Sequence, residues 1–268
     1  MNTNKIQIEN SDAIITIGTR ISVDNPEIKT YIHSAVQKGK CEFIYMHVID
    51  DIFLQDQYKQ YIKYEAGSEE GVLALLASYV VTDLSLKHKE YLEYLDVGYL
   101  SAESSIGEEE FELLAETLAS KNKITLIIGE DIYAHANFKN IENIIRLIVE
   151  NSNINIILLN NKKRLDLSKE IILDEISNIK TYNGTVIYTV NSDEDMLKGS
   201  ASFASAAKIK DNDIVNITYD SQTVKKQFKI DSNIRGTIAL YPISDNGQDD
   251  KIVSGYRFKQ VHIQKVDS

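Results

Sequence analysis

The chain has 268 residues, of which 43% are hydrophobic and 26% charged, a balance typical of soluble globular domains and unlike that of disordered or membrane-embedded chains. With 29 basic and 40 acidic residues the net charge is −11, and no Lys/Arg stripe offsets it, so nucleic acid is excluded as a partner. Cys41 is the one cysteine, which excludes an internal disulfide, a four-thiolate iron–sulfur cluster and a multi-cysteine zinc site within this chain.

The first predicted elements are a strand, a helix and a second strand. The apolar run "DAIITIG" predicts a strand that starts near Ala13 and ends at Gly18. Pro26 suits the first turn of the helix that follows, and Gly39 suits its C-terminal stop. "CEFIYMHVI" is nearly continuous in apolar residues, which predicts a strand that is buried on both faces of a parallel sheet.

The next stretch continues the alternation of helices and strands. "GSEEGVLALLASYVV" predicts a helix capped by Ser68, with Glu69 and Glu70 near the positive end of its dipole. Residues 87–105 are polar and tyrosine-rich, and their pattern leaves irregular and helical structure open. "GEEEFELLAETLAS", "KITLIIG", "NIENIIRLIVE" and "INIILL" then predict helix, strand, helix and strand. The alternation predicts an α/β fold with a doubly wound parallel sheet.

After about Thr181 the pattern changes. "GTVIYTV", "DIVNITYD", "VKKQFKID", "GTIALYPI" and "YRFKQVHIQKV" are short, partly alternating runs separated by Asp, Asn, Gly and Ser. Such runs are typical of a small antiparallel β-barrel. The sequence therefore predicts two domains, an α/β domain over 1–182 and a β-barrel-like domain over 183–268.

Two strand ends are candidate phosphate sites. Gly18 and Thr19 follow the first strand, where backbone N–H groups and a helix start can bind an anion, although a tight strand exit explains the glycine equally. Gly129 repeats the pattern, but Glu130 and Asp131 follow it and would repel a phosphate.

The sequence contains no recognisable catalytic or metal-binding constellation. No two of the five histidines have metal-ligand spacing: these are His33, His47, His88, His135 and His262. His47 lies in an apolar stretch, where a hydrogen-bonded core histidine is the usual outcome. The tyrosines Tyr91, Tyr94 and Tyr99 fit either a subunit contact or ordinary packing.

Three segments, in this order, resemble the molybdopterin oxidoreductase superfamily and, within it, the C-terminal part of the large peripheral-arm subunit of NADH-quinone oxidoreductase (respiratory complex I). They are "SDAIITIGTRISVDNPEIKTYIHSAVQKGK", "YIKYEAGSEEGVLALLASYV" and "SASFASAAKIKDNDIVNITYDSQTVKKQFKIDSNIRGTIALYPI". The resemblance implies that 1–182 is a partial superfamily α/β domain and that the barrel follows it. It also implies a vestigial cofactor site at Gly18, Thr19, Asp50, Gly67, Ser68 and Gly129. "VIDDIFL" lacks the Pro and Arg that follow the Asp in catalytic relatives, so the lineage resembled is one that no longer binds the molybdenum cofactor.

The function implied by the resemblance is a non-catalytic, structural portion of that large subunit in the peripheral arm. No cofactor is expected in this chain; iron–sulfur clusters are expected in an upstream part of the same subunit or in partner subunits. The expected partners are that upstream part and other peripheral-arm subunits, and the expected location is cytoplasmic, at the inner face of the cell membrane without insertion into it.

Two further expectations accompany this interpretation. The strand from Ala13 to Ile17 is expected to need cover at a sheet edge, and Ile28 and Ile32 on the following helix are expected to face the upstream part of the subunit. The alternative function is an independent nucleotide- or pterin-binding module of an oxidoreductase or thiamine-type enzyme, with the ligand between Gly18, Gly67 and Gly129.

Overall fold

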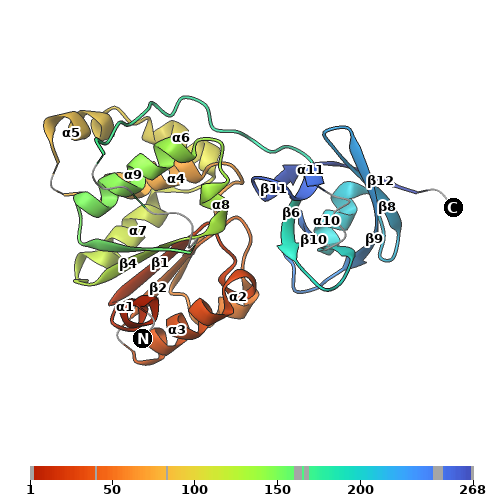
Figure 1. The fold of residues 1–268 in the computed structure, drawn as a ribbon, viewed down its shortest axis with the longest axis horizontal. Helices are drawn as coiled ribbons and strands as arrows, with labels where there is room; N and C mark the ends of the chain where they lie inside the picture. Colours follow the sequence, from red (N-terminus) through yellow and green to blue (C-terminus); the bar gives the residue numbers. More distant parts are fainter. Residues whose placement is uncertain are drawn as a thin grey trace. The chain divides into compact units, whose positions relative to one another are not determined.

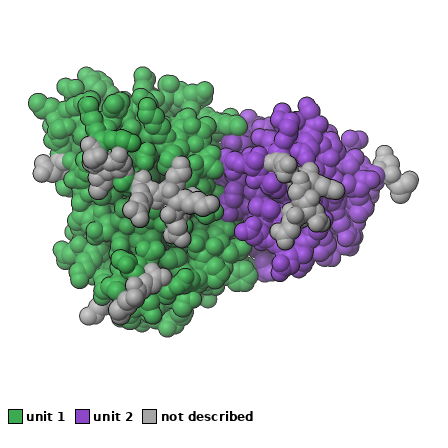
Figure 2. Space-filling view, in the orientation of Figure 1, with its two compact units in different colours: residues 1–181 green, residues 182–268 purple. Residues whose placement is uncertain are grey.

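The computed structural model of the protein describes residues 3–39, 41–82, 84–159, 165, 169–243 and 250–266. The chain divides into two compact units, 1–181 and 182–268, which are coloured separately in Figure 2. Each unit has its own sheet and its own hydrophobic core.

The first unit is built on a five-stranded parallel sheet in the order β3-β2-β1-β4-β5 (Figure 1). Its strands are β1 (Ala13–Ile17), β2 (Glu42–Met46), β3 (Gln60–Ile62), β4 (Ile124–Ile128) and β5 (Ile154–Leu158). Every residue of β1 and β4 is buried, because helices cover both faces of a parallel sheet. The predicted α/β fold with a doubly wound sheet is confirmed.

Helices lie on both faces of this sheet (Figure 1). One face carries α1 (Thr3–Glu9), α2 (Ile21–Asp24) and α3 (Pro26–Gln37). The other carries α4 (Glu69–Val80), α6 (Val97–Ser104), α7 (Glu108–Ala119) and α9 (Phe138–Glu150). The remaining short helical elements of the described part of this unit are α5 (Leu86–Glu93), α8 (Glu130–Tyr133) and a 3-10 turn, η1 (Ile52–Leu54).

Both ends of helix α3 lie where the sequence predicts. Pro26 takes its first position, where the missing N–H is no loss, and Gly39 follows the last turn with φ of +72°. The 87–105 stretch, for which the sequence leaves two structures open, is largely helical, as α5 and α6. Strand β3 is not predicted by the sequence, because three residues are too short to show a period of two.

The expected exposed edge at β1 is wrong. β1 pairs with β2 on one side and with β4 on the other, so it is a central strand, and β3 and β5 form the edges. Ile28 and Ile32 are also buried in the core, packed in one cluster with Ile14 and Phe43, and therefore do not face a partner. The helical spacing is as predicted, but the apolar side of the helix packs on the unit's own sheet.

The second unit holds a nearly closed, barrel-like sheet of seven strands in the order β11-β6-β10-β7-β9-β8-β12. The strands are β6 (Val186–Asn191), β7 (Met196–Gly199), β8 (Ile214–Tyr219), β9 (Gln222–Ile230), β10 (Ile238–Ile243), β11 (Phe258–Gln260) and β12 (His262–Lys265), and the helices are α10 (Ala201–Ala207) and α11 (Asp250–Val253). The predicted barrel is confirmed, although its sheet is mixed: β6–β10 and β7–β9 pair in parallel. Its core is centred on Phe203, Phe228 and Tyr241.

Candidate functional site

The carboxyl ends of the five parallel strands form the candidate site of the first unit. The chain runs from β1 outward through β2 and β3, then returns to the other side of β1 as β4. Ligands of open α/β sheets bind beside the carboxyl ends of the strands at such a reversal of order. We call the residues that follow the strands here (Gly18–Arg20, His47–Asp51, Tyr64–Glu70 and Gly129–Asp131) the carboxyl edge.

Gly18 and Gly129 make the closest backbone approach of the carboxyl edge. The N–H of Gly129 donates to the carbonyl of Ile17 at 2.8 Å, and the N–H of Asp131 donates to the carbonyl of Gly18 at 3.1 Å. A Cβ on Gly129 would lie 2.1 Å from the Gly18 oxygen, so only glycine fits. The two glycines thus form a tight strand exit, and the N–H groups of Gly129 and Asp131 are already bonded within the chain.

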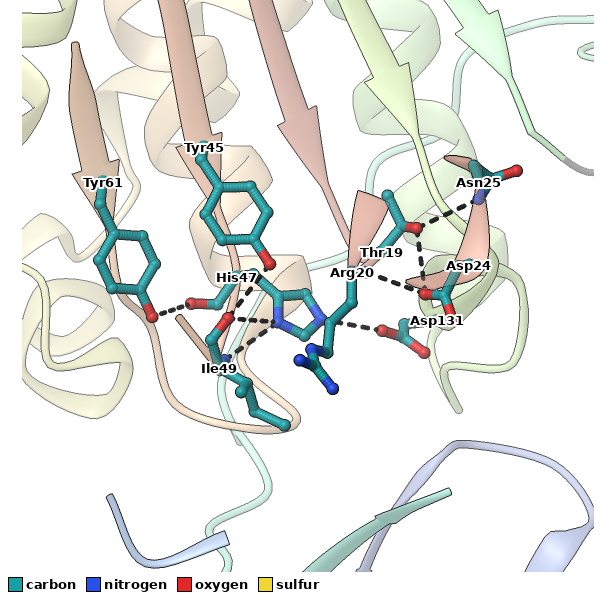
Figure 3. Close-up of polar contacts among 9 residues, drawn as sticks. All are labelled: Thr19, Arg20, Asp24, Asn25, Tyr45, His47, Ile49, Tyr61 and Asp131. Atoms are coloured by element: carbon teal, nitrogen blue, oxygen red, sulfur yellow. Dashed lines mark hydrogen bonds and ion pairs between the residues drawn. The ribbon is translucent and has the colours of Figure 1, made fainter. Parts of the chain in front are cut away.

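The turn after β1 is satisfied by its own side chains (Figure 3). The Thr19 hydroxyl donates to the Asp24 carboxylate at 3.2 Å, and the Arg20 N–H donates to the same carboxylate at 2.9 Å. Asn25 Nδ2 lies 3.4 Å from the Thr19 hydroxyl, to which it donates. Thr19 is therefore engaged in holding the turn.

Gly67 and Ser68 lie at the carboxyl edge after β3. The Gly67 carbonyl lies 3.0 Å from His135 Nε2. Ser68 holds the N-cap position of α4, but its hydroxyl donates to the Glu65 carbonyl at 2.7 Å and caps no helix N–H, so the predicted side-chain cap is wrong. The hydroxyl stabilises the turn before the helix instead.

Asp50 faces the loop that follows it. Its carboxylate accepts hydrogen bonds from Gln55 Nε2 at 2.7 Å and from the Tyr58 hydroxyl at 3.1 Å. Of the six residues that the resemblance implies, the structure thus brings Gly18, Thr19 and Gly129 together, and it places the Gly67 carbonyl beside His135. Asp50 bonds to side chains of its own loop.

A buried pair, His47 and Asp131, joins the ends of β2 and β4 and was not predicted as a pair. Both side chains are fully buried, with His47 Nε2 3.3 Å from Asp131 Oδ2 (Figure 3). His47 Nδ1 lies 3.0 Å from both the N–H and the carbonyl oxygen of Ile49, so both ring nitrogens have polar partners inside the unit. His47 is accordingly a hydrogen-bonded core histidine, which no substrate reaches. The one sequence signal was that each residue follows a buried strand within three positions.

Arg20 is a further residue of the carboxyl edge that the sequence did not single out. It is 6% exposed, and its Nε has no hydrogen-bond partner among the described residues. Figure 3 shows its guanidinium beside His47 and Asp131. Asp51 is also buried, and it accepts hydrogen bonds from the N–H and hydroxyl of Ser22, two residues after Arg20, at 2.9 and 2.6 Å. Arg20 therefore supplies positive charge to an edge otherwise rich in buried carboxylates.

Burial shifts the pKa values of two further groups, Tyr64 of the carboxyl edge and His135 beside it. Burial lowers the pKa of His135 below its usual value of 6.5, against the opposing effects of the Gly67 carbonyl and Glu70. Burial, together with the carboxylates of Glu69 and Asp131, raises the pKa of Tyr64 well above its usual value. Burial therefore favours the neutral form of both side chains.

Two backbone N–H groups of the carboxyl edge are not available to an anionic nucleotide or pterin. A bound phosphate needs free backbone N–H groups or paired cations, whereas the N–H groups of Gly129 and Asp131 are bonded internally. Three carboxylates, those of Asp51, Glu69 and Asp131, are buried at the same edge and would repel it. Among the described residues, no group of three or more His, Cys, Asp or Glu side chains is placed to hold a metal ion.

Comparison with known proteins returned no match, either to a protein family or to a curated protein. Within the described part of the chain, no helix has the length and apolar character needed to cross a membrane.

Proposed function

We propose that this chain is the C-terminal, non-catalytic portion of the large peripheral-arm subunit of NADH-quinone oxidoreductase, with a structural role in that arm. One observation carries the proposal: the strand order reverses at β1 and β4, as at a nucleotide site, yet the N–H groups of Gly129 and Asp131 are bonded to the chain's own carbonyls. A frame of this kind supports descent from a cofactor-binding domain whose ligand has been lost. The resemblance of three ordered segments to the large peripheral-arm subunit supplies the particular lineage.

In this role the chain contributes packing surface, and electrons pass through iron–sulfur clusters that other segments hold. The single cysteine suits that division, because Cys41 is buried and burial raises the pKa of its thiol to about 12, which disfavours the thiolate that binds iron. A cytoplasmic position at the inner face of the cell membrane is part of the same proposal.

Affinity purification of the tagged chain from its own cells tests this proposal. We expect NADH dehydrogenase activity and iron to co-purify with the tag, and we expect the chain produced alone to be colourless. A visible absorption band that persists through gel filtration of the chain alone, with stoichiometric iron, molybdenum or flavin, would overturn the structural role.

The second candidate function is a nucleotide-binding module, and the buried guanidinium of Arg20 is the observation that favours it. An arginine can clamp a phosphate with two parallel hydrogen bonds. Denaturing the purified chain and weighing the released small molecules by mass spectrometry decides between the two. A stoichiometric guanine, adenine or pterin compound would favour the module; its absence, together with co-purifying dehydrogenase activity, would favour the structural role.

A further inference from the structure

A groove on the first unit is formed by α5, the start of α6 and the extended segment 171–180. Its larger cavity, of about 510 Å³, is lined by Tyr91, Tyr94, Asp96, Leu173 and Glu175, among others. A second cavity of about 200 Å³ shares Tyr91, Tyr94 and Leu173 with the first and continues along α5. The larger cavity has the size that is typical of binding sites. We call the two together the α5 groove.

Apolar side chains around the α5 groove are left in solvent. Leu86 is 82% exposed, Tyr94 is 86% exposed and Ile172 is 53% exposed. Tyr94 lines both cavities, and Leu86 and Ile172 are the sequence neighbours of the lining residues Lys87 and Leu173. Large apolar side chains that gather around a cavity mark an interaction surface more often than single exposed ones do.

The charge around the α5 groove is negative. Glu90, Asp96 and Glu175 line it, and neither glutamate makes an ion pair within the described residues. Two basic side chains, Lys87 and His88, also line the smaller cavity, but Lys87 pairs with Glu170 at 3.1 Å, and the neighbouring Lys89 pairs with Glu93 at 3.7 Å. Carboxylates beside the exposed ring of Tyr94 attract a cation both by charge and by the negative face of the ring.

The 171–180 wall of the α5 groove is held in place by α9 and α6. Asn140 donates from Nδ2 to the Asp174 carbonyl at 3.0 Å and accepts from the Asp174 N–H at 2.8 Å. Asn143 donates to the Ile172 carbonyl at 2.6 Å, and the Ile179 N–H donates to the Tyr99 hydroxyl at 2.9 Å. A groove whose backbone is fixed beforehand loses less entropy when it binds.

We propose that the α5 groove binds an extended segment of a partner protein that carries arginine or lysine between apolar residues. The cation lies between the tyrosine rings and the carboxylates of Glu90 and Glu175, and the flanking apolar residues cover Leu86 and Ile172. A free amine or guanidine would meet the charge but would leave both apolar side chains in water, so a peptide accounts for more of the surface. This inference stands on the first unit alone and does not depend on the proposed function.

Fluorescence anisotropy with a labelled peptide, Gly-Ser-Leu-Arg-Leu-Arg-Ser-Gly, tests the inference on the full chain. We expect saturable binding that weakens when the salt concentration rises from about 0.05 M to about 0.5 M, because the charges lie at the surface. The double variant Glu90→Gln/Glu175→Gln should raise the dissociation constant about five- to tenfold, and Tyr94→Ala should raise it by a similar factor. These side chains are exposed or line the rim, so the fold should persist, which circular dichroism checks.

Matched controls make the outcome decisive. Glu116→Gln, an exposed glutamate of α7 outside the groove, should bind the peptide as the unchanged chain does. A peptide with glutamate in place of both arginines should not bind. Equal binding of the two peptides, unchanged affinity of the variants, or no binding at about 1 mM peptide would overturn the proposal. If arginine amide bound as tightly as the peptide, the proposal of a partner segment would be wrong, and the groove would be a site for a small cationic ligand.

Discussion

Gly129 lies so close to the backbone of Gly18 that no larger residue fits at its position. Alanine there would place its Cβ 2.1 Å from the carbonyl oxygen of Gly18, and backbone cannot rotate away as a side chain can. We expect Gly129→Ala to lower the free energy of unfolding by about 3 kcal/mol or more, measured by urea denaturation.

Gly98→Ala is the matched control for that change. Gly98 lies in α6, and the nearest atom to its added Cβ, Asp96 Oδ1, is 3.6 Å away. Alanine should leave the free energy of unfolding unchanged or raise it by up to about 1 kcal/mol. A loss of similar size in both variants would mean that the contact between Gly18 and Gly129 is not the cause.

His135 gives the second prediction at this scale. Its pKa in the folded chain lies below 6.5 because of burial, so between that lowered pKa and 6.5 the unfolded chain binds more protons than the folded one. Stability should therefore be highest above about pH 6.5 and fall as the pH drops below it.

We expect the fall in the free energy of unfolding between about pH 7.5 and about pH 5.5 to be smaller in His135→Gln than in the unchanged chain. The glutamine amide can still donate to the Gly67 carbonyl, which Nε2 faces at 3.0 Å. His33→Gln, at an exposed site on α3, is the control and should keep the full pH dependence. If the free energy of unfolding of His135→Gln fell with pH as much as that of the unchanged chain, the pH dependence would come from other groups.

Helix α9 acts as an element that orders a segment without regular structure. Asn140 and Asn143 are three positions apart, so both lie on one face of the helix, where their amides bond to the backbone of 171–180. The same side chain of Asn140 also donates to Glu70 at 2.8 Å, which ties the segment to α4. One residue thereby connects two helices and an extended chain.

Asn140→Ala tests that role at the scale of the element. The change leaves the Asp174 N–H and a buried carboxylate of Glu70 without this partner, so we expect a loss of about 1–3 kcal/mol. Hydrogen exchange should speed up in 171–180 more than in β1 or β4. Lys139→Ala, the exposed neighbour, should change neither quantity; protection of 171–180 that survives Asn140→Ala would show that apolar contacts hold the segment.

At the scale of the whole molecule, the two units have separate cores. Phe228 is fully buried in the barrel with Phe203 and Tyr241, whereas Ile14 and Ile32 belong to the core of the first unit. A cavity made in one core removes contacts from that unit alone.

Phe228→Ala should therefore destabilise the second unit by about 3–5 kcal/mol while it leaves the first unit protected. Hydrogen exchange resolved by peptide measures both at once: β8, β9 and β10 should lose protection, and β1 and β4 should keep it. Ile32→Ala is the reciprocal variant and should reverse the pattern. Equal loss throughout the chain in either variant would mean that the two units unfold together.

Local patterns determined much of this fold. The nearly continuous apolar run of β2 indicated a strand buried in a parallel sheet, and Pro26 and Gly39 marked the limits of α3, because each pattern depends on neighbours within a few residues. The change from long helical spacing to short alternating runs near Thr181 indicated the second fold type for the same reason.

Only the tertiary structure decided which residues meet. His47 and Asp131 are 84 positions apart and Asn140 and Asp174 are 34 apart, and neither spacing leaves a mark in the sequence. The glycines at 18 and 129 resemble phosphate turns, yet the order β2-β1-β4 sets them against each other, so their backbone groups bond within the chain. The sequence shows that Ile28 and Ile32 form an apolar side of a helix, but it does not show what covers that side. In the structure both pack in the core of the first unit.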